Sequence, residues 1–361
     1  MLRSPLPIRA GVSASRLYLP KESWPNLLAF LIQRFPHMSA DIIQERLARG
    51  DMVSQAGEVL RVDSPYLPDS WLWYYREVEQ EVRVPDEIAV LYQDETLVVI
   101  DKPHFLASIP GGRYLQETAL VRLRCLLGNE DISPIHRLDR DTAGLLLFCA
   151  DKRYRGAYQS LFQSRDVHKT YECVAPYRAD LAFPLRRESF IEKSPSYFTM
   201  QEGAGARAVE LAEIAGEPEA IVGEYVDMAG EKERLLQPLN SPAQEWVARV
   251  SQMQTVVAHK AMMPNSRTDI SIIKHNQEWA HYLLEPYTGK KHQLRVHMNA
   301  LGLPIMGDEF YPELLPARAV DDFSRPLQLL AREIRFKDPV TGQERVFRSR
   351  RELEGVVALI A

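Results

Sequence analysis

The chain has little cysteine and no long apolar run, and both shortages narrow its class. Its three cysteines, Cys125, Cys149 and Cys173, lack Cys-x-x-Cys spacing, which argues against disulfides or a zinc knuckle and favours a reducing compartment. No apolar stretch approaches the ~18 residues needed to cross a bilayer, and the first five residues lack the apolar centre of a secretory signal. We therefore predict a cytoplasmic protein without membrane contact.

The chain also lacks an excess of positive over negative charge. Lysine and arginine number 44 against 49 aspartates and glutamates, so the net charge is −5. A polyanionic partner would then require basic residues gathered on one face, with the acidic residues elsewhere. The 361 residues, 45% hydrophobic and 26% charged, are typical of a globular protein with one large or two ordinary domains.

The most informative stretch is a charged, turn-like segment, residues 136–144 (HRLDRDTAG), which runs into the apolar residues 145–150. A short continuous apolar run is typical of a central strand buried on both faces. Gly144 stands at the junction, where a tight change of direction requires a residue without a Cβ. The pattern predicts a strand that begins directly after a charged turn.

Asp139 projects from that predicted turn, between Arg137 and Arg140. Neighbouring positive charge favours the ionised form of a carboxylate and fixes its position. Two interpretations fit the residues alone: a structural Asp–Arg pair that closes the turn, or a functional carboxylate.

The same segment supports the second interpretation by resemblance. His-Arg-Leu-Asp followed by Thr and Gly resembles the signature of the RluA-type pseudouridine synthases, which isomerise uridine in ribosomal and transfer RNA. The resemblance implies that Asp139 is the catalytic residue. Ala143 stands where the family usually carries Ser, at a position outside the chemistry.

A second segment, residues 167–175, alternates like a strand. The family carries Lys-x-Tyr here, and Lys169 and Tyr171 match it. The resemblance implies that Tyr171 lies against the target base, as a planar phenol suits a base taken out of its stack. Without its neighbours, Tyr171 would be an ordinary strand aromatic.

A third segment, residues 288–298, resembles the family pattern Gly-x-x-His-Gln-Leu-Arg-x-His. Its arginine, the family's ion-pair partner of the catalytic Asp, maps onto Arg295. Lys290 replaces the arginine common after Gly, which keeps phosphate attraction but loses bidentate geometry. A zinc site at His292 and His297 lacks further ligands nearby.

The resemblance implies an isomerisation that needs no cofactor, because neither redox change nor net group transfer occurs. Asp139 would act beside the ribose as nucleophile or base, and Arg295 would keep it ionised. The partner would be structured RNA, ribosomal or transfer, and we expect a monomer. The flanking phosphates would be held by Arg137, Arg140, Lys290 and Lys291. His136 would support the flipped-out conformation of the target base.

The domain organisation is predicted as a small N-terminal domain at 1–80, a linker at 81–87 and a catalytic domain at 88–361, with an acidic insertion at about 203–264. The fold implied is α+β: a mixed, largely antiparallel bent sheet with flanking helices.

The N-terminal domain, two helices and a hairpin, loosely resembles the alpha-L RNA-binding module, with Arg46 and Arg49 facing phosphates; a plain packing domain fits equally. The aromatic run 71–75 is more typical of packing than of base stacking.

Two alternative functions remain. The first is a catalytically silent RNA-binding relative, which the presence of Asp139, Tyr171 and Arg295 disfavours. The second is a carboxylate-pair glycosidase using Asp139 and Asp141. Residues two apart on one turn rarely reach the roughly 5–9 Å opposed geometry of such enzymes.

Overall fold

The computed structural model describes residues 4–78, 81–195, 199–203, 205–211, 263–319 and 321–356. These residues form two compact units, the first built from residues 1–83 and 109–130 and the second from 84–108 and 131–361. The predicted domain boundaries remain a prediction. The compact units differ from them mainly in grouping residues 109–130 with the N-terminal part.

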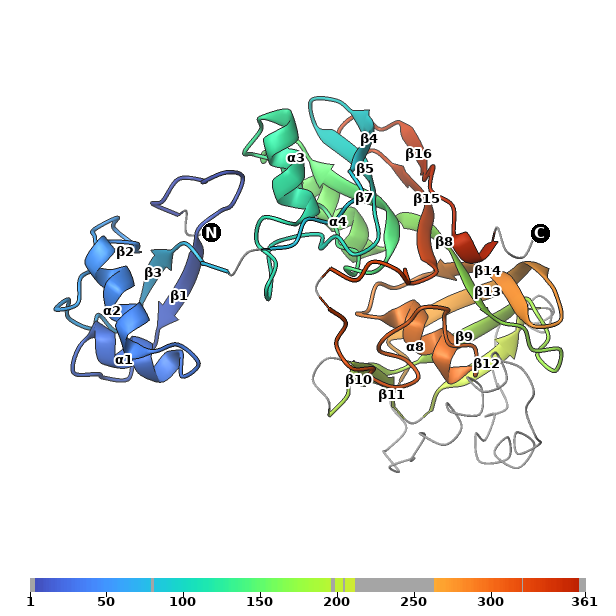
Figure 1. Ribbon diagram of the computed structural model, residues 1–361. Coiled ribbons are helices and arrows are strands. Elements are labelled where there is room, and N and C mark those ends of the chain that lie inside the picture. The colour runs from blue at the N-terminus through green and yellow to red at the C-terminus, as the bar shows by residue number, and fades with distance from the viewer. Residues whose placement is uncertain are drawn as a thin grey trace. The chain divides into compact units, whose positions relative to one another are not determined.

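The N-terminal unit packs helices on a three-stranded antiparallel sheet of order β1-β3-β2 (Figure 1). In helix α2 the Ser39 hydroxyl accepts the Ile42 N–H at the start, and Gly50 ends the helix with φ +78°. Helix α1 is capped by Asn26, whose side chain accepts the Ala29 N–H. The elements are β1 (Ser15–Leu19), α1 (Leu27–Arg34), α2 (Ala40–Arg49), β2 (Met52–Ser54), β3 (Ser70–Tyr74) and α3 (Ala119–Leu127).

The arginines of α2 do not form the predicted phosphate-facing pair. The Arg46 side chain is buried, lies 3.2 Å from a Glu77 carboxylate oxygen and donates to the Tyr75 carbonyl. Arg49 pairs with acidic neighbours, including Asp51 at 2.7 Å. Since local carboxylates neutralise both guanidinium groups, the expectation for Arg46 is wrong and that for Arg49 loses its electrostatic basis.

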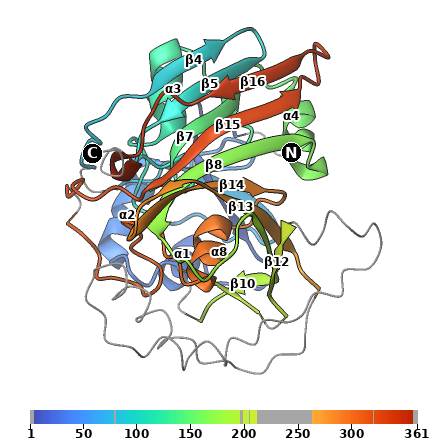
Figure 2. The same cartoon turned by 90° about the vertical axis from the view of Figure 1, so that its right-hand side faces the viewer.

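The second unit is organised around one bent sheet of order β12-β9-β13-β14-β8-β15-β7-β5-β4, with β16 paired to β15 and β6 to β7. Figures 1 and 2 show β13, β14 and β8 curving around helix α8. The pairings are antiparallel except for β7 with β15, which is parallel. This is the predicted α+β fold with a mixed, largely antiparallel sheet.

The bounds of these strands and helices are β4 (Ala89–Gln93), β5 (Leu97–Lys102), β6 (Ser133–Pro134), β7 (Ala143–Cys149), α4 (Arg155–Ser164), β8 (Val167–Pro176), β9 (Leu185–Ser189), β12 (Arg207–Glu210), β13 (Ser266–His275), β14 (Trp279–Pro286), α8 (Gln293–Ala300), β15 (Leu329–Lys337) and β16 (Glu344–Arg348). A separate hairpin joins β10 (Ile191–Lys193) to β11 (Met200–Glu202). Strand β12 belongs to the start of the predicted insertion, and residues 212–262 lie outside the described residues.

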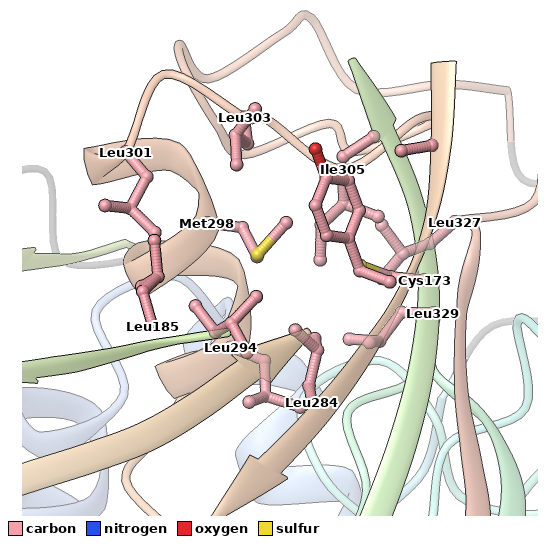
Figure 3. Packing of buried hydrophobic residues seen from close by; sticks show 14 residues of the cluster. Cys173, Leu185, Leu284, Leu294, Met298, Leu301, Leu303, Ile305, Leu327 and Leu329 are labelled. Carbon is pink, nitrogen blue, oxygen red and sulfur yellow. The ribbon is translucent and has the colours of Figure 1, made fainter. Parts of the chain in front are cut away.

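Helix α8 is fixed to the concave side of the sheet by apolar side chains. Leu294 and Met298 of α8 pack into one buried cluster with Ile270 of β13 and with Tyr282 and Leu284 of β14. Figure 3 shows Met298 pointing into this cluster, between Leu294 and Leu303. Each buried side chain of this size contributes roughly 1.5–3 kcal/mol, so the start of α8 is held in a defined position.

Strand β7 is the predicted central strand, and all seven of its residues are buried. Gly144 has φ +106°, and a Cβ there would lie 2.3 Å from the Ala331 carbonyl oxygen of β15. The glycine is therefore required by the close approach of the parallel strand as well as by its backbone conformation.

Gly144→Ala is expected to lower the free energy of unfolding by about 2–4 kcal/mol, from overpacking and a disfavoured φ. The midpoint of urea unfolding measures this loss. Gly156→Ala in α4 is the matched control, because a Cβ there meets nothing within 4 Å and alanine favours the helix. Equal midpoints for the two variants would contradict the packing argument.

Candidate functional site

A hollow of about 110 Å³ brings the three sequence segments together. Asp139 comes from the loop before β7, Tyr171 from β8 and Arg295 from α8. The hollow is smaller than the roughly 300–1,000 Å³ of sites that enclose drug-sized ligands, so it suits a ring-sized group. It is lined by Arg137, Leu138, Asp139, Thr142, Lys169, Tyr171, Pro286, Thr288, Gly289, Lys290, His292, Gln293, Leu294, Arg295 and Leu329.

The loop that carries Asp139 is held by residues 102–108. Three side chains of that segment bind backbone groups on both sides of Asp139, so the carboxylate has a fixed base. The buried Lys102 ammonium also donates to two carbonyls of its own segment, and burial lowers its pKa to about 7. The bonds to the Asp139 loop are Lys102 Nζ to Arg140 O (3.0 Å), His104 Nδ1 to Asp141 O (2.7 Å), Ser108 Oγ to Leu138 O (2.7 Å) and Leu138 N to Ser108 Oγ (3.0 Å).

The cation beside Asp139 is Arg295. Its Nη1 lies 3.6 Å from Asp139 Oδ2, while the Asp139 side chain stays 32% exposed. The other guanidinium nitrogens form two bonds to Asp308, Nε to Oδ2 at 2.7 Å and Nη2 to Oδ1 at 2.6 Å. Nη1 is buried without a hydrogen-bond partner among the described residues, so it is available to donate a hydrogen bond to Asp139.

Asp308 is the functional residue that the sequence reasoning missed. It is buried, and besides Arg295 it accepts the backbone N–H of Phe310 at 2.8 Å. Burial alone would lower the pKa of Arg295, but the Asp308 carboxylate outweighs it and the pKa is raised. The signal was present, since Asp308 ends the segment 301–308 that also resembles the family, yet no role was assigned to it.

Tyr171 and Lys169 form another wall of the hollow. Burial, and then the charge of Asp139, raises the pKa of Tyr171, so the phenol stays protonated. Lys169 Nζ donates to the Thr288 carbonyl at 3.2 Å, and burial lowers its pKa to about 8. Lys169 was noted in the sequence only as part of a motif, and the structure adds it to the lining.

Two predicted site residues lie elsewhere. The His136 ring stacks on Phe162, with centroids 4.7 Å apart, and its Nε2 accepts the Leu147 N–H at 3.2 Å. It does not line the hollow, and burial lowers its pKa to about 3. Arg140, predicted to hold a flanking phosphate beside Asp139, does not line the hollow and places Nη1 2.9 Å from Asp141 Oδ1.

Two of the remaining predicted cations line the hollow. Arg137 and Lys290 line the hollow and are exposed. Lys291 is also exposed, directly before the buried His292. Arg137 and Lys290 therefore supply, at the hollow, the local positive charge that an overall acidic chain requires for a polyanion.

Comparison with known proteins identifies this arrangement. The family model described as RNA pseudouridylate synthase matches residues 96–300, more than half of the chain. The chain belongs to the RNA pseudouridylate synthase family. Members of this family are isomerases.

Two sequence relatives carry the same activity in their names. The chain is 27% identical over 285 residues to an uncharacterised RNA pseudouridine synthase of Synechocystis, covering 79% of each protein. It is 29% identical over 253 residues to the dual-specificity RNA pseudouridine synthase RluA of Vibrio cholerae, covering 70% of this chain and 78% of that one. A human structure titled RNA Pseudouridylate Synthase Domain Containing 1 matches with 20% identity and a TM-score of 0.47, over 78% of this chain and 98% of that one.

In this pseudouridylate synthase the carboxylate-pair alternative finds little support. Asp141 is bound by Arg140 and does not line the hollow, so no opposed carboxylate pair is formed with Asp139. Among the described residues, no three His, Cys, Asp or Glu side chains gather as a metal site. The described helices are also too short or too polar to cross a membrane.

Proposed function

We propose that this chain converts specific uridines of structured ribosomal or transfer RNA into pseudouridine, with Asp139 as the catalytic residue. The observation that carries the proposal is the meeting of Asp139, Tyr171 and Arg295 in one ring-sized hollow. The reaction breaks the bond between ribose and base nitrogen, rotates the base and rejoins it through carbon. We also propose that the protein acts as a monomer in the cytoplasm and needs no cofactor.

Each residue has a defined role in this proposal. The target uridine leaves its stack and enters the hollow, where the Tyr171 ring faces the base. Asp139 acts beside the ribose as nucleophile or base, and Arg295 keeps its carboxylate ionised. Arg137, Lys290 and Lys291 contact the flanking phosphates, with Lys169 as a further cation in the lining.

A binding-only relative is the second candidate, and the experiment separates the two. Pseudouridine positions in total RNA are mapped by carbodiimide-based sequencing, from cells with and without this gene. Loss of one or a few sites establishes the activity and identifies the RNA. If no site changes, and the purified protein also leaves transcripts made in vitro without pseudouridine unmodified, the binding-only function is favoured.

The phosphate contacts are tested by salt dependence. Lys290→Ala and Lys291→Ala are each expected to weaken RNA binding and to lower the slope of log K against log salt by about 0.7–0.9. Lys152→Ala is the control, because this exposed lysine follows the far end of β7 and lies 3.0 Å from Asp131. An unchanged slope would remove that lysine from the phosphate contacts.

A further inference from the structure

His292 contacts the site in a way that no family resemblance assigned. It precedes α8 with φ +56°, and its side chain makes no capping bond to the helix. A residue with a Cβ adopts this left-handed conformation at a cost, so the position of the ring calls for another explanation. The ring is buried and points in two directions, Nδ1 toward Tyr311 and Nε2 toward Asp139.

The contacts of Tyr311 decide which ring nitrogen carries the proton. The Tyr311 hydroxyl oxygen accepts the Met200 N–H at 2.8 Å and lies 3.0 Å from His292 Nδ1. Burial raises the pKa of Tyr311, so the phenol keeps its hydrogen. Among the described residues Nδ1 is the one acceptor within hydrogen-bond distance of the Tyr311 O–H, so the O–H donates to Nδ1 and the proton of the neutral imidazole is left on Nε2.

The imidazole is neutral at working pH. Burial, and then the nearby charges of Arg295 and Lys291, lowers the pKa of His292 to about 3, against the opposing effect of Asp308 and Asp141. A neutral Nε2–H is a hydrogen-bond donor with no net charge. It lies 3.8 Å from Asp139 Oδ2, the same oxygen that Arg295 Nη1 faces at 3.6 Å.

We propose that His292, fixed as the Nε2–H tautomer by Tyr311, is a second hydrogen-bond donor to the catalytic carboxylate, alongside Arg295. This rests on the proposed function of Asp139. Catalytic hydrogen bonds commonly tighten only in the substrate complex, and both donors need move by less than an ångström to reach bonding distance. Tyr311 is then a positioning residue, since it acts through His292.

The test uses the full chain and total RNA from cells lacking this gene. His292→Gly removes the donor at a φ that glycine adopts freely, and His292→Asn keeps a side chain that tolerates this conformation. Each is expected to lower kcat on the order of 10²-fold, with KM nearly unchanged. Tyr311→Phe is expected to lower kcat less, because the tautomer is then no longer fixed but the ring remains.

Chemical rescue separates a donor from a packing role. Added imidazole is expected to restore activity to His292→Gly, whereas 1-methylimidazole, which has no N–H, is not. Wild-type protein under the same additives is the control. Rescue by both compounds, or wild-type kcat in His292→Gly, would overturn the inference, while an inactive wild-type protein would contradict the proposed function itself.

Discussion

Asp139→Asn is expected to abolish pseudouridine formation while leaving RNA affinity nearly unchanged. The substitution keeps the size of the side chain but removes the nucleophile or base on which the reaction depends. Asp139 contributes little to binding, because phosphate contacts made by cations dominate affinity for RNA. The measurements are turnover on RNA from the deletion cells and filter-binding affinity for the same RNA.

Asp141→Asn is the matched control for this prediction. It alters a carboxylate two residues away that pairs with Arg140 and does not line the hollow, so most of the activity should survive. Measurable turnover by Asp139→Asn would contradict the mechanism. Loss of activity in both variants, with folding intact, would instead support a catalytic role for Asp139 and Asp141 together.

Asp308→Asn should damage both stability and catalysis. The change leaves the buried Arg295 guanidinium without its charged partner, and breaking a buried ion pair costs about 3–5 kcal/mol. Arg295 would also lose the bidentate bond that aims Nη1 at Asp139. Urea unfolding and single-turnover rates measure the two effects.

The exposed Asp321→Asn, from the segment between α8 and β15, is the control and should change neither quantity. The double variant Asp308→Leu/Arg295→Met separates stability from catalysis. Replacing both partners of a buried pair by apolar residues is often neutral or stabilising, so this protein should regain stability but remain inactive. A double variant with normal turnover would show that Arg295 is dispensable.

The main elements were predictable because their signals are local. Residues 145–150 form a continuous apolar run, and 145–149 lie in the buried strand β7. Alternation in residues 167–175 predicted β8. The glycine at 144 was predicted from the change of direction, but the neighbour that forbids a Cβ, Ala331, is distant in sequence and could not be named.

The part of the site that lies in the three sequence motifs could be predicted. Asp139, Tyr171 and Arg295 were named, and the structure brings them together. The pairing of Arg140 with Asp141 could not be read from the sequence, because neighbours along a turn can point their side chains in different directions. Asp308 was missed because a carboxylate that binds a buried arginine resembles any surface aspartate until burial is known.

The position of β15 has a consequence for how this enzyme becomes active. Strand β15 lies between β7, which follows Asp139, and β8, which carries Tyr171. Leu330 of β15 is opposite Ala143 of β7 on one side and Glu172 of β8 on the other. The two halves of the site are therefore joined by a segment synthesised long after both. Because such distant pairings form slowly, we expect catalytic competence to appear at the final step of folding, after most of the secondary structure has formed.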